Sequence, residues 1–241
     1  EADALHGGAP AALLAEAAAA AGPGGDATVV VRLTYEFLGP VPFAPLAVSA
    51  EVVRPGRRFQ LVEGTLSAAG RDVVRVRAVR LRRGAVELPP ETGPHEARPP
   101  GPETAREDPF PPVPGMPSEG FHRTGMEIRF AGGTDFGEGP ALAWFRLGRP
   151  LVDERPPSPL ARAAAAADFG NGVAHALPFG EWLFVNTDLT VHLHREPAGE
   201  WVLLDARTRL DERGVGVAMS TLHDERGPIG LAAQSLFVDR R

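Results

Sequence analysis

The chain has 241 residues, a formal net charge of −6 and no cysteine. A chain of this length can bury one fused core or two separate ones. The negative charge argues against a nucleic-acid partner, because proteins that bind phosphate backbones normally carry a basic surplus. The lack of cysteine excludes disulfides, thiolate metal sites and a cysteine nucleophile. No stretch is long and apolar enough to span a bilayer, so we expect a cytoplasmic protein without membrane insertion.

The first predicted unit combines one helix with four strands. Pro10 and Gly22 punctuate an Ala-rich helix over residues 11–21, since Pro favours the first helical turn and Gly follows a helix end. Alternating apolar residues then predict strands over 29–37, 46–53, 59–66 and 73–81. In the last strand the parity of the arginines changes near Ala78-Val79, which indicates a β-bulge.

A proline-rich segment separates this unit from a second one. Eleven of the 25 prolines lie between Pro89 and Pro117, so we expect an extended linker there. Beyond it we predict a second Ala-rich helix over about 160–169, with Ser158 as its N-cap, and strands over 126–130, 142–147, 184–194, 201–207, 215–223 and 229–238. The expected division is a first domain at 1–84, a linker at 85–125 and a second domain at 126–241. Helices and antiparallel strands in both domains indicate an α+β fold.

The two predicted domains align as copies of one unit. AGRDVVRVRAVRLRR, starting at Ala69, aligns with RGPIGLAAQSLFVDRR, starting at Arg226. A repeat of this length indicates two similar folds. Three polar side chains of the second copy lack a counterpart in the first: the aligned pairs are Asp188 with Arg32, Thr208 with Val52, and Gln234 with Arg77. One-sided polar chemistry predicts a single working site.

Several motifs together resemble one family. The run DLTVHLHR from Asp188, followed by Glu200-Trp201, is similar to the C-terminal half of acyl-CoA thioesterase II-like proteins, and HGGAPAALLAEA near the start agrees. The resemblance covers almost the whole chain. It implies a double hotdog, in which two fused copies each wrap an antiparallel sheet around an Ala-rich central helix. It also implies hydrolysis of acyl-CoA or related acyl thioesters, a place in lipid metabolism and an acyl-CoA partner, with a homo-oligomer of double hotdogs as an option.

In that family an Asp, a Thr or Ser, and a Gln activate the water that attacks the thioester carbonyl. The resemblance places these roles on Asp188, Thr208 and Gln234. The chain has no cysteine and no Gly-x-Ser-x-Gly elbow, so water is the simplest nucleophile for a thioester. Asp188 would accept the proton from water, while Thr208 and Gln234 would orient it.

The developing oxyanion also needs hydrogen-bond donors. Backbone N–H groups at a helix start are unpaired and carry the positive end of the helix dipole. Gly7 and Gly8 precede the first predicted helix, so they are candidates for an oxyanion hole, and His6 beside them could orient substrate. A tight turn before the helix is an equally good explanation of the two glycines.

Other functions remain open at this point. His192 and His194 lie on one face of a strand, as a two-histidine metal pair requires, but no third ligand with suitable spacing is evident. We therefore expect no metal, and nothing in the sequence implies a cofactor. A hotdog hydratase or dehydratase needs Asp and His on the catalytic helix, which here is almost all Ala. A non-catalytic acyl-CoA-binding or scaffolding protein is the main alternative to a thioesterase.

Overall fold

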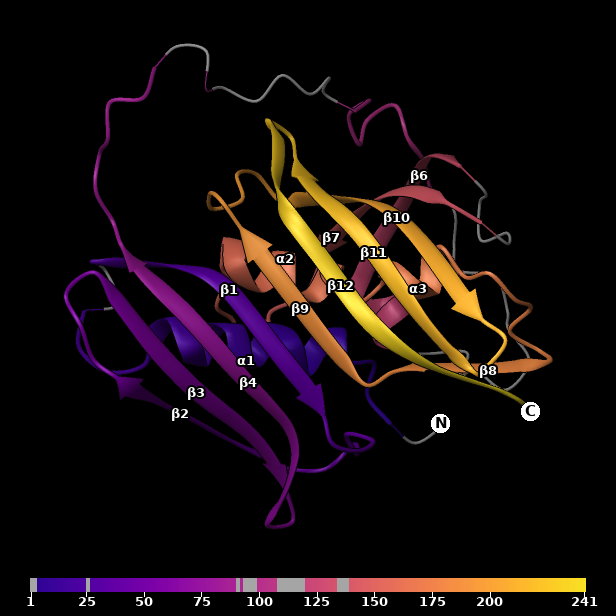
Figure 1. Cartoon of the computed structure of the whole chain (residues 1–241), viewed down its shortest axis with the longest axis horizontal. Helices are drawn as coiled ribbons and strands as arrows, with labels where there is room; N and C mark the ends of the chain where they lie inside the picture. Colours follow the sequence, from indigo (N-terminus) through magenta and orange to yellow (C-terminus); the bar gives the residue numbers. More distant parts are fainter. Residues whose placement is uncertain (1–3, 25–26, 90–91, 93–98, 108–119, 134–138) are drawn as a thin grey trace.

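A single antiparallel sheet with helices against one face forms the protein, as seen in a computed structural model that describes residues 4–24, 27–89, 92, 99–107, 120–133 and 139–241 (Figure 1). Within these residues the sheet has 12 strands. The elements in chain order are α1 (Gly8–Ala20), β1 (Thr28–Phe37), β2 (Leu46–Arg54), β3 (Phe59–Ala68), β4 (Arg71–Arg82), β5 (Arg106–Glu107), the π-helix η2 (Phe121–Gly125), β6 (Met126–Gly133), β7 (Ala141–Leu147), α2 (Pro159–Ala167), α3 (Gly170–Val173), β8 (Trp182–Asn186), β9 (Asp188–Leu193), β10 (Trp201–Asp211), β11 (Val215–Asp224) and β12 (Gly227–Arg240).

Two halves of the chain meet in the middle of this sheet. The strand order is β2-β3-β4-β1-β9-β12-β11-β10-β7-β6-β5, with β8 pairing on β12. The first half contributes β1 to β4 and α1, and the second half contributes β5 to β12, η2, α2 and α3. Strands β1 and β9 join the halves in an antiparallel register that runs from Arg32 opposite His192 to Glu36 opposite Asp188.

The two long helices are buried because their side chains are small. Ala11, Ala15 and Ala18 of α1 have no exposed surface, and neither do Ala161 and the alanines at 163–166 of α2. Methyl side chains let sheet and helix backbones approach closely while keeping helix propensity high. The helices also contact each other across the halves, where a carboxylate oxygen of Glu16 accepts a hydrogen bond of 2.8 Å from the backbone N–H of Ser158.

Most elements predicted from the sequence are confirmed, with local differences. Helix α1 begins at Gly8, three residues before the predicted start, and the predicted strand over 184–194 is interrupted at Thr187 into β8 and β9. The N–H of Thr187 still donates to the carbonyl of Ser235 at 3.1 Å, so the chain continues along β12 after the interruption. The predicted bulge near Ala78-Val79 exists as a register shift in the partner strand β1, between Val30 and Arg32. Among the described residues, no helix is long and apolar enough to cross a membrane.

The same irregularity occurs at corresponding places in the two halves. Val30 lies opposite Arg80 on one side of the shift in β1, and Asn186 lies opposite Leu236 on one side of the β8–β9 interruption. Superposing these positions aligns Val30 with Asn186, and their strand partners Arg80 and Leu236 with each other. Ala78 on β4 and Gln234 on β12 each lie two residues before those partners, so they are aligned as well. The sequence alignment, which set Arg77 against Gln234, is therefore shifted by one residue here, because sequence similarity along a strand does not determine the strand's pairing register.

Candidate functional site

A buried carboxylate marks the site. Asp168 caps the C-terminal end of α2 and is only 6% exposed. The side-chain amide of Asn186 donates to its Oδ1 at 2.8 Å, and that of Gln234 donates to the same oxygen at 3.3 Å. Burial raises the pKa of Asp168 to about 7, although hydrogen bonds from Asn186, Gln234 and the backbone of Gly8 act in the opposite direction. The carboxyl group can therefore exchange a proton near neutral pH.

Hydrogen bonds at both ends hold the side-chain amide of Gln234 in one orientation. It lies on β12 and is 2% exposed. Its Nε2 donates to the backbone carbonyl of Asp168 at 3.2 Å, and its Oε1 accepts from the backbone N–H of Asn171 at 3.1 Å. A Cβ on Gly170 would lie 3.2 Å from Oε1 and 2.8 Å from Ser220 Oγ, so a side chain there would crowd this arrangement. Both ends of the Gln234 amide are thus constrained.

The start of α1 brings the first half of the chain to this carboxylate. A Cβ on Gly7 would lie 2.7 Å from Asp168 Oδ2, and one on Gly8 would lie 2.8 Å from the carbonyl oxygen of Ala165. A Cβ at either position would press on these groups, the side chain of Asp168 at Gly7 and the backbone of Ala165 at Gly8, so the close approach depends on glycine. The site is therefore shared, with a helix start from the first half and an acid from the second.

His6 adds an imidazole to the cluster. Its Nδ1 lies 3.1 Å from Asp168 Oδ2 and 3.0 Å from the backbone nitrogen of Gly8, which donates to it. The ring stacks on Phe169 with a centroid separation of 4.2 Å and an interplanar angle of 20°. Burial, followed by the nearby His122, lowers the pKa of His6 to about 3. His6 is consequently neutral at physiological pH.

Aromatic rings enclose this group of polar side chains. Phe169 has ring centroids at 5.0 Å from Phe145 and 6.2 Å from Phe121, and Phe121 lies 6.0 Å from His6. Such a wall limits water access and strengthens the electrostatic effect of each neighbouring dipole. It accounts for the neutral imidazole and the raised carboxyl pKa in physical terms.

The structure separates Asp188 from the other predicted site residues. Leu189 and Val191 on β9 point into the core, so Asp188 faces the outer side of the sheet, where its Oδ1 accepts from the backbone N–H of Ser235 at 2.6 Å. Among the described residues, no hydrogen bond connects Asp188 with Gln234. Gln234 instead contacts Asp168 and lies close to the Gly7-Gly8 helix start.

Thr208 lies on the inner face, in the same row of the sheet as Gln234. Thr208 on β10 is opposite Ala218 on β11, which is opposite Gln234 on β12, so one strand separates the two polar side chains. The hydroxyl of Thr208 is buried and has no hydrogen-bond partner among the described residues. It is therefore free to bind a ligand or a water in this row.

Sequence reasoning missed Asp168 and Asn186. A signal for Asp168 exists, because it is the first acidic residue after an uninterrupted run of five alanines and buried helices rarely end on an unpaired acid. Asn186 carried no comparable signal, since a single polar residue in a half-buried strand usually faces solvent. His192 is exposed on the outer face, and the described residues contain no cluster of three or more His, Asp or Glu that could bind a metal.

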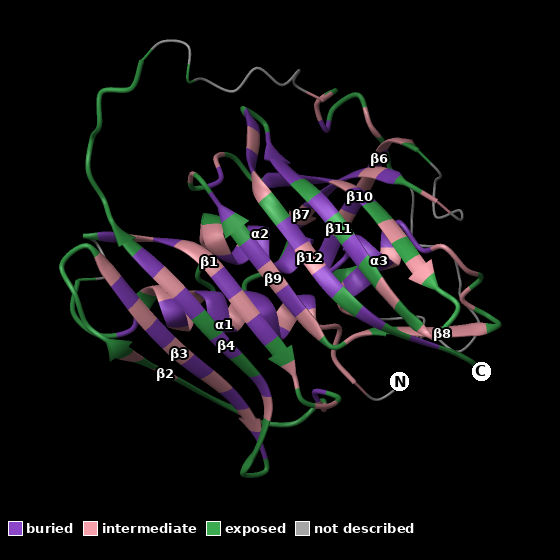
Figure 2. Ribbon diagram, viewed as in Figure 1, coloured by how far each residue is buried: buried purple, intermediate pink, exposed green. Residues whose placement is uncertain are grey.

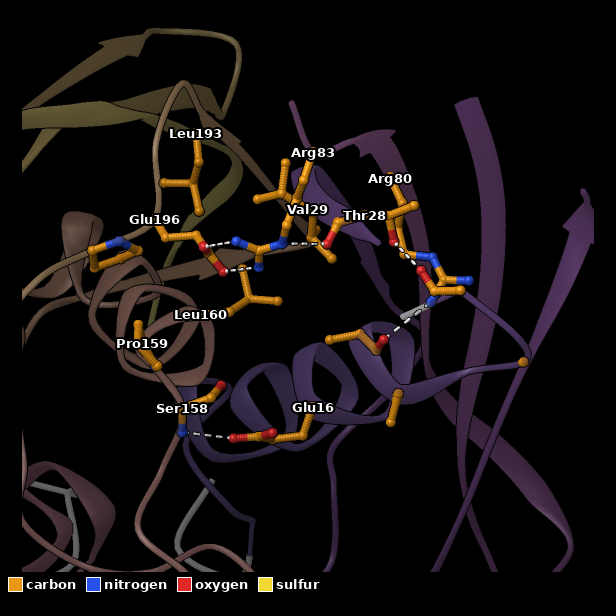
Figure 3. Close-up of a pocket in the computed structure, with 16 residues that line it drawn as sticks. Glu16, Thr28, Val29, Arg80, Arg83, Ser158, Pro159, Leu160, Leu193 and Glu196 are labelled. Atoms are coloured by element: carbon orange, nitrogen blue, oxygen red, sulfur yellow. Dashed lines mark hydrogen bonds and ion pairs between the residues drawn. The ribbon is translucent and has the colours of Figure 1, made fainter. Parts of the chain in front are cut away.

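A cavity of about 790 Å³ lies where the end of α1 meets the start of α2 (Figure 3). Ala19 and Ala20 line one side, and Ser158, Pro159 and Leu160 line the other. Val30, the counterpart of Asn186, also lines it. This cavity occupies the position in the first half that the Asp168 cluster occupies in the second. Val30 stands there in place of the amide of Asn186, and charged side chains, among them Glu16 and Arg80, also line the cavity.

Comparison with known proteins agrees with this arrangement. Residues 1–81 match the family model of the acyl-CoA thioesterase N-terminal domain, and residues 94–238 match that of the C-terminal domain. The chain belongs to the acyl-CoA thioesterase family. A search of curated protein sequences finds no significant match.

Solved structures of thioesterases share its fold. A protein from Thermobifida fusca assigned as a thioesterase II is 20% identical, covering 99% of this chain and 88% of its own, with a TM-score of 0.74. A hot dog fold protein of unknown function from Alicyclobacillus acidocaldarius is 20% identical over 100% and 89%, with a TM-score of 0.73. The acyl-CoA thioesterase II TesB2 from Mycobacterium marinum is 18% identical over 99% and 90%, with a TM-score of 0.65. This family member therefore has the hot dog fold.

Proposed function

We propose that the chain is a double hotdog hydrolase that cleaves acyl-CoA, or a related acyl thioester, to a free acid and a thiol. Membership of the acyl-CoA thioesterase family supports the reaction class. The observation that carries the proposal is the contact of a buried carboxyl group, Asp168, with two side-chain amides, Asn186 and Gln234. Such a group can hold a water and accept its proton without a cofactor.

Asp168 serves as the general base in this proposal. Because its pKa is about 7, Asp168 is present near neutral pH both as a carboxylate, which can accept a proton, and as a carboxylic acid, which can return it. Asp168 takes a proton as the water oxygen bonds to the thioester carbonyl carbon. When the tetrahedral intermediate collapses, the C–S bond breaks and Asp168 returns that proton to the departing sulfur. Asn186 and Gln234 keep the carboxylate and the water in line, which lowers the entropic cost of the attack.

The helix start of α1 supplies the remaining part. The start of α1 places the backbone N–H of Gly7 at the positive end of the helix dipole beside the reacting group, where negative charge develops on the carbonyl oxygen, while the N–H of Gly8 donates to His6 Nδ1. His6 is neutral and its Nδ1 accepts the N–H of Gly8, so Asp168 Oδ2 bonds to this nitrogen when the carboxyl group is protonated and donates its hydrogen to Nδ1. Thr208 keeps its predicted role as a hydroxyl that contacts substrate or water in the row of Gln234.

The experiment compares the two candidate bases. Asp168→Asn keeps the shape of the side chain, and we expect it to lower the rate of thiol release from acyl-CoA at least about a hundredfold, as loss of a general base does. Asp188→Asn is the matched control and should stay within about threefold of the unchanged chain, because Asp188 binds a backbone N–H on the outer face. Circular dichroism of both variants confirms folding.

The opposite outcome would return the base to Asp188, as the sequence resemblance first suggested. If neither the unchanged chain nor the variants release thiol, but acyl-CoA binds with an affinity that both substitutions leave intact, the chain is a non-catalytic acyl-CoA-binding protein. Isothermal titration calorimetry with acyl-CoAs of several chain lengths distinguishes that case from an inactive preparation.

A further inference from the structure

One cationic side chain of the first half is buried without an acidic partner. Every second residue of β4 from Val74 to Arg80 is buried, which places Arg80 on the helix-facing side of the sheet (Figure 2). Arg80 is 1% exposed. Burial lowers the pKa of its guanidinium group, and no carboxylate in the described part of the chain acts in the opposite direction. Arginine is seldom buried to this extent without a counter-ion, because desolvating its charge is costly.

The hydrogen bonds of Arg80 leave one edge of its guanidinium group free. Nη1 donates to the carbonyl oxygen of Ala19 at 3.0 Å, whereas Nε and Nη2 are buried and have no hydrogen-bond partner among the described residues. Nε and Nη2 lie on the same edge of the planar group, so their N–H bonds point in the same direction. A carboxylate can accept both at once, which is the two-point contact that arginine forms with planar anions.

A bound water is the simplest alternative occupant of this edge. Gln60 lies opposite Arg80 on β3, and its buried Oε1 also has no hydrogen-bond partner in the described part of the chain. A water between the two side chains would accept from Arg80 and donate to Gln60. Such a water has no net charge, so it would leave the buried guanidinium without a counter-ion. An anion satisfies the two N–H groups and also balances the charge.

The cavity between the end of α1 and the start of α2 gives such an anion a place to bind. Its volume is about 790 Å³, and Arg80 lines the side opposite to Pro159 (Figure 3). The lining also includes the apolar side chains of Val29, Val30, Leu160 and Leu193. Apolar walls with one convergent polar group are typical of sites for small molecules. A ligand with one anionic head and an apolar chain matches this lining.

The other charged groups of the cavity already have partners. Arg83 forms an ion pair with Glu196, and the carboxylate of Glu16 accepts the backbone N–H of Ser158 at 2.8 Å. Among the described lining residues, Arg80 is therefore the cation that lacks a counter-ion. The negative charge of Glu16 disfavours a second negative charge on the ligand. A monocarboxylate fits this balance better than a phosphate dianion.

We propose that this cavity binds an aliphatic monocarboxylate, with the carboxylate on Nε and Nη2 of Arg80 and the chain against Leu160 and Leu193. The cavity lies at the start of α2, whereas Asp168 follows the last residue of this helix. The nine residues of α2, at a rise of about 1.5 Å each, separate the two sites. The proposal therefore does not depend on thioester hydrolysis, although a free acid is a product of the proposed reaction.

The contact is tested by titrating the full chain with sodium octanoate and recording NMR spectra of the arginine Nε–H groups. Arg80→Leu introduces the residue that stands at the matching position of the second half, Leu236, and the signal that it removes is that of Arg80. We expect this signal to move downfield in the unchanged chain as octanoate is added, because a charge-assisted hydrogen bond forms at Nε. Calorimetry should show that Arg80→Leu lowers the octanoate affinity at least about tenfold.

Two further variants separate ligand binding from stability. Arg80→Leu also removes the donor to Ala19, so Leu160→Glu provides a disruption that keeps this contact. It adds a carboxylate in the first turn of α2, where the helix dipole favours an acid, and should lower the octanoate affinity at least about tenfold by repulsion. Arg77→Leu is the matched control, because Arg77 lies on the same strand but is exposed and paired with Glu63. Its octanoate affinity should stay within about twofold of that of the unchanged chain.

Ligand controls test the chemical class. Octan-1-ol has the same chain without the charge, and inorganic phosphate has charge without the chain, so both should bind at least about tenfold more weakly than octanoate. An Arg80 signal that does not move would mean that water alone occupies the edge and would overturn the proposal. Phosphate binding as tight as that of octanoate would also overturn it. So would octanoate binding that Asp168→Asn abolishes and Arg80→Leu leaves intact, since the acid would then occupy the Asp168 cluster.

Discussion

The two halves of the chain share one backbone arrangement but carry different side chains at matching positions. Both pair a long antiparallel strand with an irregular one, and in each the irregularity lies at the same place. At matching positions the first half has Val30 and Ala78, whereas the second has Asn186 and Gln234. Since the first half folds with apolar residues there, the fold does not require the amides. When folding does not need a buried polar group, a role at a functional site is the simplest reason for its presence.

The first half also contains a buried polar side chain of its own. Arg80, whose counterpart is Leu236, is 1% exposed and lines the cavity at the end of α1 (Figure 3). Its Nη1 donates to the carbonyl oxygen of Ala19 at 3.0 Å and so satisfies a carbonyl at the C-terminal end of the helix. Each half has therefore gained a buried polar group that the other lacks, and only the second half gained an acid.

The largest expected difference between the halves is the response to pH, because only the second half has this buried acid. The folded pKa of Asp168, about 7, lies above that of an unfolded aspartate. Between about pH 4 and 7 the unfolded chain releases this proton while the folded chain keeps it, so the free energy of unfolding falls as pH rises, by at most about 4 kcal/mol. Urea unfolding of the unchanged chain and Asp168→Asn from pH 4 to 8 measures this. Parallel curves for the two proteins would contradict the raised pKa.

Exchanging residues between the halves sharpens the comparison. Gln234→Leu removes the amide that contacts Asp168 and the N–H of Asn171, and we expect the rate of thiol release to fall about a hundredfold. The mirror change, Ala78→Gln, should lower stability by about 1 to 3 kcal/mol through overpacking, without reducing the rate per folded molecule. Steady-state kinetics and thermal unfolding of both variants separate the effects. Equal rate losses would mean that both halves take part in catalysis.

The junction of the halves can be disturbed at a single backbone position. In Gly7→Ala the new Cβ would lie 2.7 Å from Asp168 Oδ2, so helix start and acid must move apart, and we expect about a tenfold loss of kcat. Gly172→Ala is the matched control, because a Cβ there has no neighbour within 4 Å among the described residues. A Gly7→Ala variant as active as the Gly172→Ala control would show that this close approach is not needed for the reaction.

The smallest effect is expected at the outer connection between the halves. Arg83, directly after β4, binds the carboxylate of Glu196 with an Nη2 to Oε1 distance of 2.6 Å, and both side chains are 47% exposed. Exposed ion pairs are screened by water and salt, so Arg83→Gln should change the free energy of unfolding by less than about 1 kcal/mol. Chemical denaturation at low and high salt tests this. A larger loss would indicate that this pair, more than the helices and the β1–β9 junction, joins the halves.

Much of the architecture could be read from periodicity and helix punctuation. Alternating apolar residues determine strands such as 59–68 because each successive side chain alternates between core and solvent. The interruption at Thr187 could not be read, since it depends on tertiary pairing with β12. A continuous strand would place Asn186 and Asp188, which are two residues apart, on the same face. Because of the interruption, Asn186 faces inward and contacts Asp168, whereas Asp188 faces outward.

The site was only partly predictable for the same reason. Gln234, His6, Gly7 and Gly8 were identified from the repeat and from helix signals, and the structure brings them together. Asp168 was overlooked because an acid at the end of an alanine helix resembles an ordinary solvated helix end. Its importance depends on burial by Phe169 and on contact with the other half of the chain, and neither is visible in local sequence.

The covalent connection of the halves has a kinetic consequence. The helix start at Gly7-Gly8 and the acid at Asp168 belong to one polypeptide, whereas two separate subunits would have to find each other before such a site existed. Dilution cannot take this pair apart. Specific activity should consequently stay constant at enzyme concentrations where any association between separate chains has been lost.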